Sequence, residues 1–358
     1  MIEIDGSFGE GGGQILRTSL ALSIVTGQAF QIRNIRAARR KPGLRRQHLA
    51  AVNAAAEIAK AKVEGVSLGS RELRFEAGGV AAGEYQFAIG TSGSATLVLQ
   101  TILPALIVAE KSSTLTLDGG THNPHAPPFD FLENTFLPIV NQMGPTITAT
   151  LERRGFYPAG GGRFTVLIKP ASQLSPIQLL ERGKIQRCRA TAIVAGLPEH
   201  IAQRELNVVR ETLGWTDEAL RLEAVPDGPG NVLMLEIQCE RITETFTGFG
   251  ERGVPAERVA EEAVGAAKTY LDADVPVGKL LADQLILPFA IAASHSTRES
   301  SPQDESVRLA DFRSSFKTLP LSSHTETNIE VVKKFLDVDV RVIPDSDCVC
   351  VVEVLKAK

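Results

Sequence analysis

Hydrophobic and polar positions divide the start of the chain into short segments with two different periods. Apolar side chains recur at every second position around Ile4 and Ile32, which is typical of strands, and at helical spacing after Gln14 and after Gln47. A glycine-rich segment and a basic segment separate these patterns. The expected elements are strands at 2–4, at 30–35, near 63 and at 73–76, and helices at 14–25 and 47–61.

The order strand, helix, strand, helix, strand, strand recurs twice further along the chain. An internal repeat of this kind indicates one structural unit used three times. We therefore predict an α/β (α+β) fold with three βαβαββ repeats around a pseudo-threefold axis, at about 1–82, 83–182 and 277–358. The last two repeats contain helix segments of similar sequence. In these segments Gln100, Ile102, Leu103 and Pro104 match Gln284, Ile286, Leu287 and Pro288.

Extra sequence lies between the second and third repeats. Residues 183–276 predict an inserted small α/β domain, so that 1–182 and 277–358 form the large repeat domain. We find no constellation of reactive groups in the insert. The polar segment 296–315 predicts a long loop or lid. The remaining expected strands are at 85–89, 113–117, 146–152, 163–169 and 188–194, two on either side of a turn at 227–230, and at 338–343 and 348–354. The remaining long helices are expected at 129–143, 199–213 and 255–271.

Composition narrows the class of protein. A hydrophobic fraction of 43% and a charged fraction of 22% are those of a globular protein, and the net charge of -4 excludes a chain that is basic throughout. Four cysteines in 358 residues do not form a disulfide framework, and Cys348 and Cys350 are expected on one face of a strand. With no signal pattern and no apolar run of spanning length, we expect a soluble, cytoplasmic protein with no membrane partner.

A loop with five glycines, residues 5–13, precedes the first expected helix. Such loops let a backbone approach phosphate closely, although this one lacks the Gly-Lys-Ser/Thr of a Walker A motif. A tight structural turn explains the glycines equally well. Glu10 within the loop favours the phosphate interpretation, because a carboxylate beside bound phosphates usually requires a divalent cation between them.

The second loop is strongly basic. From Arg33 to Arg46 the chain has seven basic residues and no acidic one. A solvated loop is one interpretation. A site for the phosphates of a nucleotide or of RNA is the other, since the planar guanidinium of arginine binds phosphate oxygens in pairs.

A third loop, residues 321–326, contains His324. Thr327 and Glu330 have the spacing of a capping box, which predicts that a helix begins there and that His324 lies three residues before it. A histidine beside a helix N-terminus can attack a phosphoryl group, or it can be a cap, a surface residue or a packed ring. The repeat puts this loop in the same place as 36–46 and 121–128, but it does not prove that the three loops converge.

Together, these motifs resemble those of the RNA 3′-terminal phosphate cyclase family over nearly the whole chain. The resemblance rests on Gly-Glu-Gly-Gly-Gly-Gln-Ile-Leu-Arg at 9–17, Arg36 with the basic run 39–47, the glycine-rich run 155–162, Leu-Ala-Asp-Gln at 281–284, and His324 with Thr327-Asn328. It implies three βαβαββ repeats with a smaller α/β insert.

The resemblance also implies an activity. ATP is the co-substrate, with Mg²⁺ or Mn²⁺, and an RNA 3′-phosphate is converted to a 2′,3′-cyclic phosphate through a covalent histidinyl-AMP and an RNA-adenylate. It assigns the nucleophile to His324, the metal to Glu10, phosphate or RNA-end binding to Arg17, Arg36, Arg39, Arg45 and Gln47, and the nucleotide pocket to Gln100, Pro127, Phe131, Leu280, Asp283 and Gln284.

Several alternatives stay open. Leu280 stands where family members can carry an aromatic residue that stacks on adenine, so base preference is open. A non-catalytic cyclase-like RNA-binding protein in ribosome assembly would lack the nucleophile that His324 supplies, and an enolpyruvyl transferase would need a different site. A monomer and a dimer are both compatible with the sequence, and so are several classes of RNA, 5′-phosphates and DNA ends as further substrates.

Overall fold

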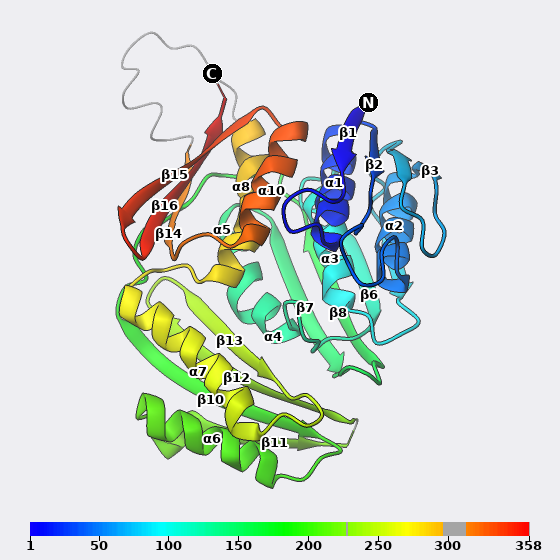
Figure 1. The fold of residues 1–358 in the computed structure, drawn as a ribbon. Helices are drawn as coiled ribbons and strands as arrows, with labels where there is room; N and C mark the ends of the chain where they lie inside the picture. The colour runs from blue at the N-terminus through cyan, green and yellow to red at the C-terminus, as the bar shows by residue number, and fades with distance from the viewer. Residues whose placement is uncertain (227, 296–312, 358) are drawn as a thin grey trace, which may run out of the picture.

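The structure is a computed structural model that describes residues 1–226, 228–295 and 313–357. These residues form four sheets of four strands each, with helices packed against them (Figure 1). The predicted α/β fold class is confirmed. Within the described ranges, no helix is both long enough and apolar enough to cross a bilayer.

Three of the sheets have the same strand order, in which the first two strands of each sheet are parallel and the other pairs antiparallel. The pseudo-threefold axis that this order suggests stays a prediction. The first sheet is β1 (Ile2–Asp5), β2 (Phe30–Arg33), β4 (Leu73–Glu76) and β3 (Lys62–Glu64); the second is β5 (Glu84–Ala88), β6 (Ser113–Gly119), β8 (Gly162–Lys169) and β7 (Thr146–Arg153); the third is β9 (Gln178–Leu179), β14 (Ser314–Thr318), β16 (Val349–Lys356) and β15 (Val338–Ser346).

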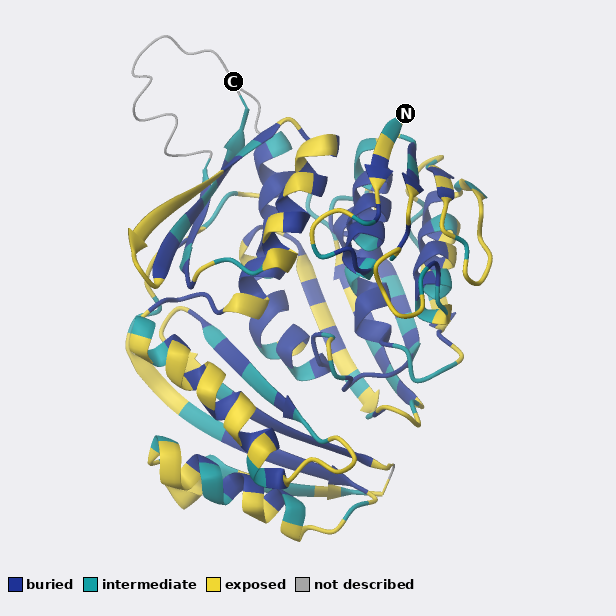
Figure 2. Cartoon of the chain, viewed as in Figure 1, coloured by how far each residue is buried: buried dark blue, intermediate teal, exposed yellow. Residues whose placement is uncertain are grey.

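Two helical segments accompany each of these sheets. Apolar residues such as Leu16 and Leu20 of α1 are fully buried, and α3 is buried on nearly all sides (Figure 2). The expected helix 129–143 is interrupted by a π-helical turn. The helices are α1 (Gly13–Thr26), α2 (Arg46–Ala59), α3 (Ala95–Leu106), α4 (Phe129–Phe131) with η1 (Leu132–Phe136) and α5 (Leu137–Gln142), α8 (Lys279–His295) and α10 (Ser323–Phe335).

The third sheet is assembled from both sides of the insert. Gln178 and Leu179 of β9 pair with Ser315 and Phe316 of β14, in parallel. The repeat limits predicted from the sequence put these two residues in the second repeat. A strand of two residues has no detectable apolar period, so β9 itself was not predicted. The domain limits themselves stay a prediction.

The insert has a sheet of its own, with strand order β11-β10-β12-β13. Helices α6 and α7 pack on one another and on this sheet (Figure 1). Strand β13 was not expected from the sequence. The elements are β10 (Ile185–Ala195), α6 (His200–Leu213), η2 (Asp217–Ala219), β11 (Leu220–Val225), β12 (Gly230–Cys239), β13 (Thr243–Phe249) and α7 (Ala256–Ala273).

Two expectations near the C-terminus were wrong. Ser314 and Ser315 are buried in β14 and do not belong to a loop; the rest of the predicted lid, 296–312, lies outside the described residues. Cys348 lies exposed in the turn before β16, whereas Cys350 is buried within that strand, so the two do not share a strand face. All four cysteines are free.

Candidate active site

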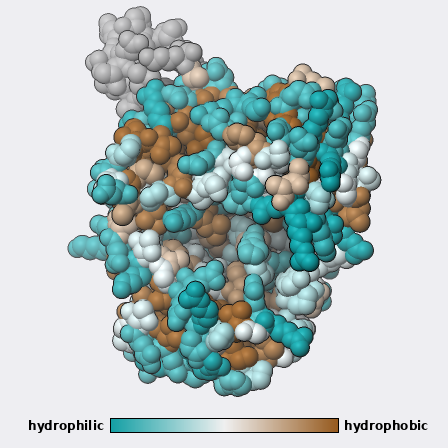
Figure 3. Space-filling model, in the orientation of Figure 1, coloured by the Kyte–Doolittle hydropathy of each residue, from teal (hydrophilic) through white to brown (hydrophobic). Residues whose placement is uncertain are grey.

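A cleft of about 1290 Å³ lies between the first two repeats and the insert, with His324 of α10 on its wall. The space-filling view shows that this face is hollowed between the repeats and the insert (Figure 3). Seven residues predicted for the site line this one cleft. They are Glu10, Arg17, Arg36, Arg39, Arg45, Gln47 and His324.

The N-termini of four helices end at the cleft. The first turns or caps of α1, α2, α3 and α10 all contribute to its wall, and each brings unpaired backbone N–H groups and a positive partial charge. The wall also carries six arginines against two glutamates, although the chain as a whole has a net charge of -4. The cleft is therefore suited to a polyanion.

His324 lies inside α10, in its first turn, and not on the preceding loop as predicted. Ser322 is the N-cap, because its hydroxyl accepts a hydrogen bond of 3.1 Å from the backbone N–H of Thr325. The predicted capping box does not form. The Thr327 hydroxyl donates to the Ser323 carbonyl at 2.6 Å, and Glu330 accepts from Lys333 at 3.1 Å. Ser322 is as good a cap as Thr327 and lies earlier in the chain.

Two buried side chains orient the imidazole of His324. The Gln14 amide nitrogen donates to Asp283 Oδ1 at 2.7 Å, which turns the Gln14 oxygen toward His324 Nδ1, its hydrogen-bond partner. An amide oxygen only accepts, so Nδ1 carries the hydrogen and the lone pair of the neutral ring is on Nε2. Nε2 lies 3.5 Å from Glu10 Oε1, at the cleft.

The charge state of His324 is also set by its surroundings. Burial lowers its pKa below the usual 6.5, and the charges of Arg17 and Arg39 lower it further, while Asp283 acts in the opposite direction. The ring is therefore neutral near pH 7. A neutral imidazole with a free Nε2 and a 48% exposed side chain can act as a nucleophile.

A chain of amides connects this histidine to a buried arginine. Arg17 Nε donates to Gln100 at 3.0 Å, and Gln100 donates to Gln284 at 2.7 Å. Gln284 in turn donates to Asp283 Oδ2 at 3.0 Å. Burial raises the pKa of Asp283, and hydrogen bonds from Gln14 and Gln284 and the charges of His324 and Arg17 oppose that effect. These amides line a second, small pocket that shares Arg17 with the cleft.

Arg17 keeps its charge in this environment. Burial lowers its pKa to about 10, with Asp283 acting against the shift. A guanidinium with that pKa is still protonated at neutral pH. It therefore provides a fixed positive charge behind the N-terminus of α1 and close to His324.

Glu10 stands between His324 and Arg39. Its carboxylate forms an ion pair with Arg39, whose guanidinium also donates to the Glu10 carbonyl at 3.2 Å. Among the described residues, no group of three or more His, Cys, Asp and Glu side chains could hold a metal ion. A divalent cation at Glu10 would therefore have one protein carboxylate and would need phosphate oxygens and water as its other ligands, which is the usual situation for Mg²⁺.

His48, in the first turn of α2, was not predicted for the site although it lies on the cleft wall. Its ring is 3% exposed, and Nδ1 accepts from the backbone N–H of Arg45 at 3.0 Å. Burial, followed by the charges of Arg17, Arg36 and Arg45, lowers its pKa to about 3. His48 is thus held neutral in the middle of an arginine cluster.

Three residues predicted for the nucleotide pocket are not on the wall of either pocket. Phe131 is completely buried, and Leu280 is 38% exposed in the first turn of α8. Pro127 is buried, with its carbonyl accepting from the Thr96 hydroxyl at 2.7 Å. Their proposed contacts with adenine stay predictions.

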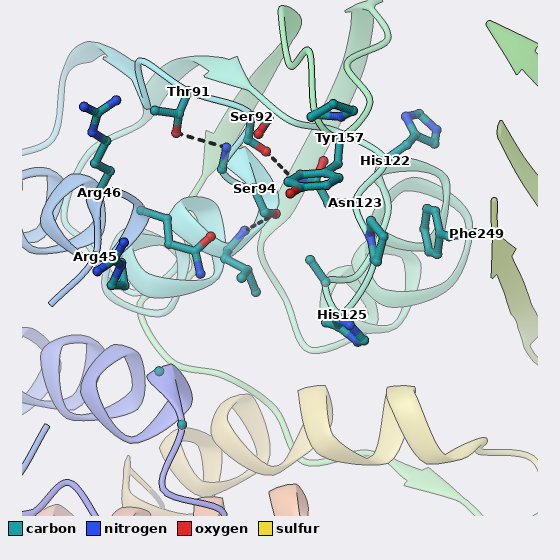
Figure 4. A pocket seen from close by; sticks show the side chains of 18 of the residues that line it. Arg45, Arg46, Thr91, Ser92, Ser94, His122, Asn123, His125, Tyr157 and Phe249 are labelled. Atoms are coloured by element: carbon teal, nitrogen blue, oxygen red, sulfur yellow. Dashed lines mark hydrogen bonds between the residues drawn. The ribbon is translucent and has the colours of Figure 1, made fainter. Parts of the chain in front are cut away.

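The far part of the cleft was not predicted. Figure 4 shows His122, His125, Tyr157 and Phe249 around one part of the pocket and Arg45 and Arg46 in another. The loop 121–128 had been singled out by its place in the repeat, which was a signal for the two histidines. No sequence signal marked the residues that the insert contributes to the wall, because they form no pattern of reactive groups. These insert residues are Gly230, Asn231, Phe249, Gly250, Glu251 and Arg252.

Comparison with known proteins identifies the family. The model of the family described as RNA 3'-terminal phosphate cyclase matches residues 8–342. The chain belongs to the RNA 3′-terminal phosphate cyclase family. A protein of Koribacter versatilis (strain Ellin345) with this name is 50% identical over 350 residues, 97% of this chain and 93% of the relative.

Further relatives agree with this membership. RNA 3'-terminal phosphate cyclases of Ectopseudomonas mendocina (strain ymp) and Ralstonia nicotianae (strain ATCC BAA-1114 / GMI1000) are each 46% identical, over 95% and 97% of this chain and 94% of each relative. The predicted membership of an enzyme family is confirmed. In this cyclase-family chain, the arginine-rich cleft around His324 is the candidate active site.

Proposed function

We propose that the protein uses ATP to convert the 3′-phosphate of RNA into a 2′,3′-cyclic phosphate, through a histidinyl-AMP at His324 and an RNA-adenylate. The observation that carries the proposal is the orientation of the imidazole. Gln14 accepts a hydrogen bond from Nδ1 of His324, which keeps the hydrogen of the neutral ring on that nitrogen. Nε2 faces the cleft, whose arginines and helix N-termini favour anions. Membership of the cyclase family supports the same reaction.

In the first step, His324 Nε2 attacks the α-phosphorus of ATP and pyrophosphate leaves. A bond from phosphorus to nitrogen forms as the bond to the bridging oxygen breaks. The imidazolium that results keeps its proton on Nδ1 and donates a hydrogen bond to the Gln14 oxygen. Gln14 is held in turn by its hydrogen bond to Asp283. The arginines and helix N-termini of the cleft stabilise the charge on the phosphates.

In the second step, an oxygen of the RNA 3′-phosphate attacks the same phosphorus, and the bond to Nε2 breaks. The nitrogen recovers its lone pair, and the ring returns to its starting state. In the third step, the RNA 2′-hydroxyl attacks the activated 3′-phosphorus, AMP leaves, and the hydroxyl proton passes to solvent. Two covalent steps replace one difficult condensation.

The metal ion fits the same arrangement. Glu10 would hold Mg²⁺ or Mn²⁺ together with phosphate oxygens, and the ion would neutralise charge on the phosphates. The free cysteines support a reducing compartment, and we propose the cytoplasm.

The test uses ATP labelled in its α-phosphate. The wild type should acquire a label that acid removes and base does not, while His324→Ala should acquire none. His200→Ala, at the exposed start of α6, is the matched control and should be labelled like the wild type. Equal labelling of His324→Ala would exclude His324 as the nucleophile.

The assignment of the metal to Glu10 has a separate test. Glu10→Ala removes the carboxylate beside Nε2 and should weaken metal-dependent labelling, so that a higher concentration of Mg²⁺ or Mn²⁺ is needed. An unchanged metal dependence would take Glu10 out of the metal site.

A further inference from the structure

The hairpin loop between β7 and β8 presents an aromatic ring to the cleft. Tyr157 lines the cleft wall and is 63% exposed, one of the largest exposures of an apolar or aromatic residue in the part of the chain that the structure describes. Within the described residues, its hydroxyl makes no hydrogen bond. This glycine-rich loop, 155–162, is one of the motifs that the proposed chemistry at His324 leaves unexplained.

The loop is firmly held although its tyrosine is exposed. The Gly155 carbonyl accepts hydrogen bonds from the backbone N–H groups of Thr121, at 2.9 Å, and His122, at 3.0 Å. Gly160 comes so close to the loop before α3 that a Cβ there would lie 2.9 Å from the Ser92 Cα. The backbone on both sides of Tyr157 is therefore tied to the second repeat.

The neighbouring residue ties the same loop to the insert. Phe156 is 3% exposed and packs with Ile193, Val232 and Met234 of the insert. A Cβ on Gly230 would lie 2.2 Å from the Phe156 ring, so only glycine allows this approach. Phe156 points into the core and Tyr157 points out of it, which preorganises the exposed ring in the cleft.

The insert adds an aromatic ring and a cation to this part of the wall. Phe249 ends β13, pairs with Val232 and is half-buried. Arg252, exposed in the loop that follows, makes no ion pair or side-chain hydrogen bond with any described residue. Figure 4 shows Tyr157 and Phe249 in the same region of the pocket, away from Arg45 and Arg46.

Aromatic faces and unpaired arginines are the two components that bind single-stranded nucleic acid. Bases stack on exposed rings, and the guanidinium groups neutralise backbone phosphates. The end of the cleft near His324, with its arginines and four helix N-termini, is suited to triphosphate. We propose that Tyr157, together with Phe249 and Arg252 of the insert, forms a subsite for the 3′ end of the RNA strand, with Tyr157 stacked on one of the last two bases.

This inference rests on RNA being the substrate under the proposed function. Its test measures RNA binding directly, by fluorescence anisotropy of a short single-stranded RNA with a 3′-phosphate, without ATP. Tyr157→Ala should weaken binding about 5- to 150-fold, because stacking on an aromatic ring contributes roughly 1–3 kcal/mol per base. Tyr157→Phe keeps the ring and should bind within about twofold of the wild type, as should Leu167→Ala, an exposed apolar control on β8 outside the cleft.

Abasic RNA identifies the stacking partner. Removing the base from one of the last two nucleotides should weaken binding by the wild type and should have little further effect on Tyr157→Ala. If neither abasic position shows this coupling, or if Tyr157→Ala binds RNA like the wild type, the subsite is refuted. Arg252→Gln should lower the salt dependence of binding by about 0.7, the value for one phosphate contact to a single strand.

Labelling by ATP separates the two proposals, since the first half-reaction contains no RNA. If the wild type fails to form a protein–AMP, the proposed function fails, while the binding results still decide the subsite. If Tyr157→Ala reduces ATP labelling as strongly as it reduces RNA binding, the ring serves the nucleotide and the RNA subsite is refuted.

Discussion

The first turns of α2 and α10 each place a histidine on the cleft wall, and the two histidines have opposite properties. His48 and His324 each lie in the first turn of the second helix of a unit, on the wall of one cleft, and both have a lowered pKa. His48 is 3% exposed and uses Nδ1 to cap its own helix. His324 is 48% exposed and uses Nδ1 as a donor to Gln14.

This difference shows that the partner of Nδ1 and the exposure of Nε2 determine what a histidine can do at such a position. An accepting Nδ1 in His48 puts the hydrogen of the neutral ring on Nε2, which leaves no exposed lone pair. In His324, Nδ1 donates, so the hydrogen of the neutral ring is on Nδ1 and the lone pair is on the exposed Nε2. The first turn of the second helix therefore provides a structural ring in one unit and a candidate nucleophile in the third.

The largest effect should follow from breaking the orientation of His324. Gln14→Met keeps the length of the side chain but removes the oxygen that accepts from Nδ1. Losing this hydrogen bond should slow formation of the protein–AMP about 5- to 150-fold, since a buried group left without its partner costs roughly 1–3 kcal/mol. Stopped-time labelling with α-labelled ATP measures the rate, and a rate equal to the wild type would show that Gln14 does not orient the ring.

The dependence of protein–AMP formation on pH tests the charge state of His324 and the effect of Asp283 on it. His324 must be neutral to react, so labelling should fall only as the pH drops through its lowered pKa, below 6.5. Asp283 stabilises the charged ring, and Asp283→Asn should therefore move this acidic limb to lower pH. A limb that moves to higher pH would contradict the proposed role of Asp283.

An intermediate effect should appear in stability, through His48. Its pKa is about 3 in the folded protein against 6.5 for the free side chain. The unfolded chain binds the proton more readily, so this contribution to stability is complete above pH 6.5 and is lost as the pH falls toward 3. Between pH 7.5 and 5, the free energy of unfolding should fall by about 2 kcal/mol more in the wild type than in His48→Gln.

Urea denaturation at the two pH values measures this difference. His324→Ala is the matched comparison, because its ring is half-exposed and should contribute much less. If His48→Gln loses as much stability on acidification as the wild type, His48 is not held neutral by the fold.

The smallest effect concerns the helix caps. Ser322 caps α10 through its side chain, whereas Arg45 at the same position of α2 makes no side-chain cap bond. Ser322→Ala should lower the free energy of unfolding by about 1 kcal/mol, while Arg45→Ala should change it by only a few tenths. Equal losses in urea denaturation would show that the two caps do not differ.

Much of this arrangement could be predicted from the sequence, because it depends on local patterns and on the repeat. The strand at 73–76 and the basic and glycine loops follow from apolar periodicity, charge and glycine content. The start of α10 could not be fixed, since Ser322 and Thr327 are both good caps. The packed structure shows that the Ser322 hydroxyl accepts from a backbone N–H of α10, whereas the Thr327 hydroxyl accepts from the backbone N–H of Glu10. Strand β9 was missed because two residues carry no period.

The site was predictable where a charge or a motif marks it, and unpredictable where a contact between distant segments creates it. Arg39 and Glu10 belong to conspicuous loops. The role of Gln14 depends on Asp283, which is 269 positions away, and the cleft wall supplied by Phe249 and Arg252 depends on how the insert docks. No spacing in the sequence reveals such neighbours.

The hydrogen bond between Gln14 and His324 joins residues 310 positions apart, close to the two ends of the chain. During synthesis on the ribosome, the glycine loop and the arginines emerge early, and His324 emerges only after the second repeat and the insert. A partly made chain therefore has the anion-binding loops without an oriented imidazole. Any product that ends before residue 324, from premature termination or from proteolysis, lacks the proposed nucleophile however well its first two sheets have folded.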